Sequence, residues 1–171
     1  MGMAELTLPG GASFLITKSP AETSGESVEM EITLPPGAPG PPRHLHPRQE
    51  ERWDVLEGEL TVFLDGRWRS LRAGDSLSIP RGHAHTLRNR SGETVRVRDS
   101  HWPALDFEDY IVKIHRLAQA GKIGDPRRPS TLIHFAMLWQ EQQCQVAARP
   151  LERGALSLLA RLGRLLRFRT G

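Results

Sequence analysis

Short strand-like segments separated by glycine and proline turns fill the first hundred residues and restrict the possible folds. The clearest predicted strand runs from Glu26 to Leu34, where apolar residues alternate with polar ones from Val28 onward, as in a strand with one buried and one solvated face. Further strands are predicted at residues 14–17, 51–57, 60–64, 68–71, 76–79, 83–88 and 94–101. This succession favours an antiparallel sandwich or barrel.

A proline-rich stretch at residues 35–42 interrupts the strand pattern. Because proline cannot donate to a strand ladder, this stretch is predicted to be a stiff loop that leads to His44. His44 and His46 are two residues apart and therefore share one face of an extended chain. Glu51 has the opposite parity, but a break at Pro47 allows a new strand to turn its carboxylate back toward the two imidazoles.

Imidazole and carboxylate ligands together suit one divalent transition metal ion, with Fe, Mn, Co, Ni, Cu and Zn all compatible. Four protein ligands leave positions open on an octahedral ion, where substrate, water or dioxygen can bind. A third histidine, His85, has to come from a more distant strand, which closure of the sheet would bring near.

Two segments of the sequence resemble the paired motifs of the cupin superfamily. The His-x-His pair, glutamate and glycine of the first motif correspond to His44, His46, Glu51 and Gly58. The usual upstream glycine falls on Ala38, with Gly37 and Gly40 on either side. The second motif is matched in full by Gly74, Pro80, Gly82, His85 and Asn89, and the resemblance covers residues 26–101.

The resemblance implies a six-to-eight-stranded jelly-roll barrel with a metal held by His44, His46, Glu51 and His85. It also suggests a quercetinase-like dioxygenase in which Glu51 alternates between ligand and catalytic base. Cupins carry out many unrelated functions, so a non-catalytic protein that binds a metal and a small ligand, or an interaction module, is the alternative.

Other residues near the motifs leave alternatives open. Trp53 and Val55 share the face of Glu51 and are expected to line the interior, whereas Glu50 and His83 are expected to point elsewhere. Asp99 and His101 have the parity of the buried face of their strand, where they could support the metal or act as an acid/base pair. A strand that frays before Pro103 would instead leave both at the rim, and this is the alternative we favour, since a buried charge needs a partner.

The hydrophobic period changes to that of helices after Pro103. Helices are predicted from about Phe107 to Ala118, from a Ser130 cap to about Val146, and from Pro150 onward. We therefore expect an α+β chain with a cupin domain at residues 1–103 and a helical extension at residues 104–171. Cys144 is expected to be a small core residue on the second helix.

The charge distribution also divides the chain. Residues 1–111 hold 12 Lys+Arg against 17 Asp+Glu, and residues 112–171 hold 11 against 3. The last helix, with its leucines and arginines, is expected to pack on the barrel or form a homodimer rather than lie on an anionic membrane. Nucleic-acid binding is not expected because aromatic residues are not interleaved with the basic ones. The single cysteine and the lack of a secretory or membrane-spanning pattern suggest a cytoplasmic protein whose partner is a small molecule.

Overall fold

The computed structural model describes residues 5–125 and 127–170 and contains two antiparallel sheets and three helices. The first sheet has the strand order β1-β2-β3-β10-β5-β8 and the second the order β11-β4-β9-β6-β7. The strands are β1 (Glu5–Thr7), β2 (Ser13–Lys18), β3 (Val28–Leu34), β4 (His44–Leu45), β5 (Glu50–Glu57), β6 (Glu59–Leu64), β7 (Arg67–Arg72), β8 (Ser76–Ile79), β9 (His85–Arg88), β10 (Val95–Trp102) and β11 (Val146–Ala147).

The two sheets pack face to face and share one apolar core. Strand β3 alternates buried and half-buried residues along its whole length, as its sequence period predicts. Its partner β10 places Val97 opposite Ile32, and both side chains are buried. From the second sheet, Leu60 and Val62 of β6 are fully buried in the same core. The result is a β-sandwich whose interior is apolar at one end.

The expected closed barrel is not what the structure shows. Among the described residues, every strand pairing lies within one of the two sheets, so hydrogen bonds do not join them into a ring. All strands predicted from the sequence are present, with ends shifted by one or two residues. The short strands β1 and β11 were not predicted, because two or three residues are too few to show a period.

Three helices follow β10: α1 (Phe107–Gln119), α2 (Pro129–Glu141) and, after β11, α3 (Pro150–Leu165). The predicted course of the second helix is wrong at both ends. Pro129 is its first residue and no side chain caps it, because proline is already suited to this position. The helix stops at Glu141, and Val146 instead pairs with Leu45 of β4. Cys144 consequently lies in the connection between α2 and β11, not on a helix.

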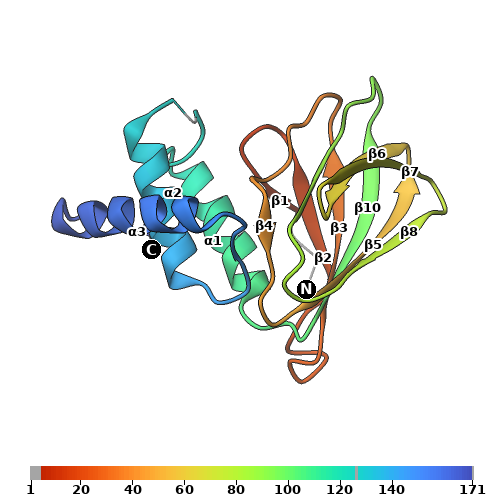
Figure 1. The fold of residues 1–171 in the computed structure, drawn as a ribbon, viewed down its shortest axis with the longest axis horizontal. Coiled ribbons are helices and arrows are strands. Elements are labelled where there is room, and N and C mark those ends of the chain that lie inside the picture. Colours follow the sequence, from red (N-terminus) through yellow and green to blue (C-terminus); the bar gives the residue numbers. More distant parts are fainter. Residues whose placement is uncertain (1–4, 126, 171) are drawn as a thin grey trace.

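Figure 1 shows the three helices together on one side of the two sheets, next to β4, with α3 reaching furthest from them. Helix α1 contributes Phe107, Tyr110 and Ile111 to the main core. Helix α3 packs on α2, where Ala160 joins Ile133, Ala136 and Met137 in a smaller cluster. None of the helices described is long and apolar enough to cross a bilayer.

Candidate metal site

Strand register brings the four motif residues together from both sheets. In the second sheet His44 of β4 lies directly opposite His85 of β9. In the first sheet Glu51 of β5 lies opposite His101 of β10. His46 follows β4, and its ring centroid is 5.1 Å from those of both His44 and His85. The three predicted histidines and the predicted glutamate therefore face one another across the sandwich, each at most 5% exposed.

Backbone carbonyls fix how each histidine ring points. The Nδ1 atoms of His44, His46 and His85 lie 2.9, 2.7 and 2.8 Å from the carbonyl oxygens of Pro42, Cys144 and His83 respectively. Since a carbonyl oxygen only accepts, each Nδ1 carries a proton and donates it. The Nε2 atom of each ring is thereby the one left for a metal, and a backbone partner on Nδ1 is the usual support of a histidine ligand.

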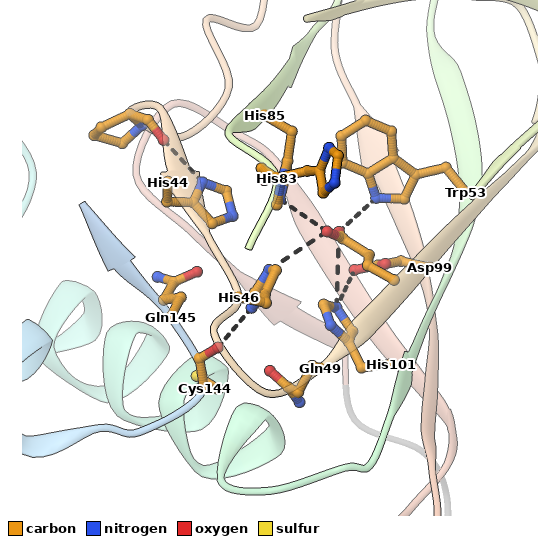
Figure 2. A network of polar contacts seen from close by, with 12 residues as sticks. His44, His46, Gln49, Trp53, His83, His85, Asp99, His101, Cys144 and Gln145 are labelled. Atoms are coloured by element: carbon orange, nitrogen blue, oxygen red, sulfur yellow. Dashed lines mark hydrogen bonds and ion pairs between the residues drawn. The ribbon is translucent and has the colours of Figure 1, made fainter. Parts of the chain in front are cut away.

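The Glu51 carboxylate lies beside the rings of His46, His85 and His101, and Figure 2 shows these three rings close together. Its Oε2 is 2.8 Å from His85 Nε2 and 3.4 Å from His46 Nε2. Its Oε1 accepts a hydrogen bond of 2.6 Å from Trp53 Nε1. The indole thus fixes one carboxylate oxygen and leaves the other toward the histidines. This contact was not predicted, although Trp53 was expected on the same face.

Three of these buried atoms have no hydrogen-bond partner among the described residues: His46 Nε2, His85 Nε2 and Glu51 Oε2. An Nε2 with its proton on Nδ1 is an acceptor, as is a carboxylate oxygen. Two acceptors at 2.8 Å repel each other unless a proton or a metal cation lies between them. Nitrogen and oxygen acceptors that converge on one point are what a transition metal requires, so the residues present fit such an ion.

The pKa shifts describe how the cluster holds its charge without a metal. Burial, assisted by the charges of His85 and His46, lowers the pKa of His44 well below its usual value. Burial alone would also lower the pKa of His46 and raise that of Glu51. The attraction between His46 and Glu51 raises the pKa of His46 and lowers that of Glu51, and the charges of His85 and His101 also lower the pKa of Glu51. These attractions outweigh burial, so both net shifts are opposite to those that burial alone would give. The cluster thus favours an ionised Glu51, the state that binds a cation.

The favoured expectation that Asp99 and His101 lie at the rim is wrong. Strand β10 continues without fraying to Trp102, so both side chains face the interior and are 2% and 0% exposed. His101 Nε2 is 3.1 Å from Asp99 Oδ2 and 3.8 Å from Glu51 Oε1. Burial, together with the nearby Glu51, raises the pKa of Asp99. The partner that a buried charge needs is present, and sequence could not show it.

Other predicted positions agree with the structure. Val55 is 2% exposed and lies in the core with Trp53. Glu50 is solvated and pairs with Arg81 at 3.7 Å. His83 points away from the cluster, and its Nδ1 contacts Asp65 at 2.8 Å on the surface. The side chains of these two residues therefore lie outside the site, although the backbone carbonyl of His83 orients His85.

The loop before His44 explains why the first motif departs from the usual pattern at Ala38. Gly40 has a φ of +72°, and a Cβ there would lie 1.6 Å from the carbonyl oxygen of Leu87. Gly40 is thus the position that requires glycine, two residues after the expected one. Ala38 instead accepts a 3.0 Å backbone hydrogen bond from Asn89, whose side-chain amide also donates to Leu34 O, Pro35 O and Glu93 O.

Residues that follow β10 in the sequence also support the site, and the sequence alone did not indicate this. Strand β11 pairs with β4, so Ala147 lies opposite His44. The Cys144 carbonyl orients His46, and the Phe107 ring of α1 stacks on His101 at a centroid distance of 3.7 Å. Phe107 was predicted only as part of an apolar helix face. The predicted helical extension therefore contacts the candidate metal site directly.

Two overlapping groups of side chains could hold an ion: His44, His46 and His85, and His46, Glu51 and His101. Within each group the ligand atoms lie within 4.8 Å of one another. His46 belongs to both, and its one free nitrogen can serve a single ion. Fold and site together define a two-sheet β protein with a histidine and carboxylate cluster that could hold a metal.

The cupin domain family matches residues 30–101, the segment that carries all four motif residues. This part of the chain therefore has the cupin fold. The quercetinase-like subtype is a finer distinction that this match does not make.

Known proteins with similar sequences include "Polyketide synthase CurC" of Streptomyces cyaneus, 35% identical over 104 residues, covering 52% of this chain and 65% of the relative. "Uncharacterized protein YdbB" of Bacillus subtilis (strain 168) is 47% identical over 47 residues, covering 27% of this chain and 42% of the relative. The chain thus spans less than two thirds of each relative. Among solved structures, KdgF from Halomonas sp. superposes with a TM-score of 0.54 at 22% identity, covering 61% of this chain and 92% of the other, which supports the fold alone.

Proposed function

We propose that this protein binds one divalent transition metal ion through His44, His46, Glu51 and His85 and acts as a dioxygenase-like oxidoreductase on a small organic substrate. The observation that carries the proposal is the contact between His85 Nε2 and Glu51 Oε2, two buried acceptors 2.8 Å apart. Either a proton or a metal cation removes the repulsion between these two acceptors, but a single proton would leave His46 Nε2 without a partner, whereas a metal can bind all three atoms.

An oxygenated substrate, such as a flavonol or a 1,3-diketone, fits the proposal best. The relative named polyketide synthase CurC supports this class, since polyketide chains carry 1,3-dicarbonyl groups. Enolisable carbonyl compounds bind metals through oxygen and lose a proton when they do so. The site then needs a base close to the metal position, and an ionised Glu51 supplies one.

The residues of the chain have distinct parts in such a reaction. A bound transition metal supplies a redox-active centre with open coordination positions. The three histidines hold it, with their Nδ1 protons tied to carbonyl oxygens. Glu51 would alternate between metal ligand and base and, as a base, would take a substrate proton on Oε2 while Trp53 holds Oε1 in place. His101 lies behind the same carboxylate and is itself oriented by Asp99.

A non-catalytic cupin that binds a metal and a small ligand is the alternative function. It is favoured by how closely the interior is filled. The rings of His46 and His85 are 2% and 0% exposed, and Phe107 stacks on His101 from the side of the helices. A substrate would need room beside these rings, which a metal alone would not. In either case we regard residues 104–171 as an extension that supports residues 1–103.

Metal content tests the first half of the proposal. Protein purified without added metal is expected to contain one transition metal ion per chain by elemental analysis. His85→Ala should weaken metal binding by more than about a hundredfold, since loss of a supporting partner alone costs roughly ten- to a hundredfold. His83→Ala is the matched control, because this neighbouring histidine is exposed and should leave metal content unchanged. Equal metal content in both variants, or none in the parent, would refute the site.

Oxygen consumption tests the second half. The metal-loaded protein should consume dioxygen with a member of a panel of flavonols and 1,3-diketones. Glu51→Gln should abolish consumption, whereas Glu50→Gln, the same change one residue earlier at an exposed position, should not. Metal binding without oxygen uptake across the panel would support the non-catalytic alternative.

A further inference from the structure

Helix α3 carries a stripe of exposed leucines that no described residue covers. Leu151, Leu158, Leu162, Leu165 and Leu166 are 89%, 67%, 44%, 80% and 55% exposed. With the exposed Ala155 between them, the positions from 151 to 165 follow each other at intervals of four and three residues. At 3.6 residues per turn this spacing places them on one side of the helix.

A different side of α3 already has its partner. Ala160 and Gly163 are the buried residues of the helix. A Cβ on Gly163 would lie 2.6 Å from Ile133 Cγ2 of α2, so the two helices approach closely there. The leucine stripe is therefore not needed to hold α3 on the protein. Exposed apolar area of this extent on a folded protein marks an interaction surface.

Arg161 borders the leucine stripe on the side away from α2, whereas Arg164 lies four residues after the buried Ala160 and so further from the stripe. Arg161 lies three residues after Leu158 and four before Leu165, so it neighbours both on the helix surface. Arg164 follows Arg161 by three residues. Neither forms an ion pair with a described acidic residue, since the ion pair recorded on this helix joins Arg149 to Glu152. The charge beside the stripe is thus positive and uncompensated, which calls for an anionic partner.

Both the charge and the composition of α3 narrow the choice of partner. A second copy of the chain would bring a second α3 with the same uncompensated positive charge against the first, which charge repulsion opposes. Hot spots of protein interfaces are enriched in tryptophan and tyrosine, and α3 has no aromatic residue. A leucine face next to arginines is instead the composition of a helix that lies in a membrane interface. Helix α3 is also the element furthest from the sheets, so a flat surface can reach it (Figure 1).

We propose that α3 docks the protein onto an anionic lipid membrane, with its leucine stripe in the acyl boundary, Arg161 against the headgroups and Arg164 adding positive charge near the surface. This inference is independent of the proposed metal chemistry. It reverses the preference that the sequence alone suggested, because that preference assumed that the leucines would be covered by the protein.

Vesicle co-sedimentation of the full chain tests the docking surface. The protein should sediment with vesicles of phosphatidylcholine and phosphatidylglycerol, and much less with phosphatidylcholine alone. The pair Leu158→Ser and Leu165→Ser should reduce the bound fraction at least roughly tenfold in partition coefficient, because two large apolar side chains leave the interface. Circular dichroism and metal content should stay unchanged, which shows that the variant is folded.

An arginine pair gives a charge-matched comparison. Arg161→Gln with Arg164→Gln should weaken binding roughly tenfold, whereas Arg67→Gln with Arg69→Gln removes the same charge from exposed positions of β7 and should have little effect. Equal losses in both pairs, or no sedimentation of the parent, would overturn the proposal. The proposal would also be overturned if sedimentation velocity showed that the parent is a dimer, that the leucine variant is not, and that the dimer does not bind vesicles.

Discussion

The interior between the sheets and the outer side of α3 depart from the usual distribution of residues in opposite ways. In the interior, the charged or polar side chains of His44, Glu51, Asp99 and His101 are at most 5% exposed. On α3, leucines at positions 151 and 165 are 89% and 80% exposed. A buried ionisable group costs folding free energy unless it is paired, and a large exposed apolar patch marks an interaction surface.

The two regions differ in the kind of ligand that would complete them. The interior needs one cation, because its acceptors point at a common centre and its surroundings are fixed by strand register. The α3 surface needs an extended partner, because its leucines run along the whole helix. A ligand for one region should leave the other unaffected, which gives the comparison its tests.

Metal binding at the interior site should give the largest change in unfolding free energy, and this change should not depend on the α3 surface. Chelator-treated protein should gain about 4 kcal/mol in unfolding free energy at a free ion concentration about a thousand times its Kd, because a ligand that binds only the folded state stabilises it by mass action. Thermal unfolding with and without the ion measures this. The Leu158→Ser and Leu165→Ser variant should show the same gain, and Glu51→Gln a much smaller one. A gain that is equal in Glu51→Gln would mean that the ion binds elsewhere.

Glycine substitutions should separate the close packing of the sheets from the open side of α3. Gly40→Ala should destabilise the protein by about 3 kcal/mol or more, because the residue has a positive φ and its new Cβ would meet the Leu87 carbonyl. Gly154→Ala in α3 should stabilise it by about 0.5–1 kcal/mol, since nothing lies within 4 Å of the new Cβ and alanine favours helix. Urea denaturation measures both. Effects of the same sign would show that the helix is constrained where the structure leaves it open.

Much of the fold could be predicted because its strands show their period locally. Residues 28–34 alternate in the sequence and alternate in burial. What failed depended on contacts made at long range. Val146 becomes a strand residue only because β4 is there to pair with it, and the exposed side of α3 could not be told from its packed side, since leucines occupy both.

The candidate site was predicted in its four motif residues but not in its support. Parity placed His44 and His46 on one face, and the break at Pro47 selected Glu51 over Glu50. The contacts with Cys144 O, Phe107 and Trp53 Nε1 connect residues whose proximity or direction no spacing encodes. Asp99 and His101 had the right parity, and their burial was discounted only because each seemed to lack a partner.

The last predicted effect is a pH dependence specific to the interior of the metal-free protein. The pKa of His44 is held well below 6.5 by burial and by His85 and His46. Below pH 6.5 His44 therefore binds a proton in the unfolded chain but stays neutral in the folded protein until the pH reaches its lower pKa there. Stability should fall as the pH drops from 6.5 toward the lower pKa of the folded state, by up to about 1.4 kcal/mol per pH unit.

The variant His44→Gln isolates this contribution, because glutamine does not titrate. His46 acts in a different window, since its pKa is raised above 6.5 and its protonation stabilises the folded state as the pH falls toward 6.5. Free energies of unfolding are measured by chemical denaturation in the presence of chelator. As the pH is lowered, the value for the parent protein should approach that of His44→Gln or fall below it. Parallel curves for parent and variant would contradict a neutral, buried His44. The α3 arginine variant should follow the parent throughout, because arginine stays charged over this range.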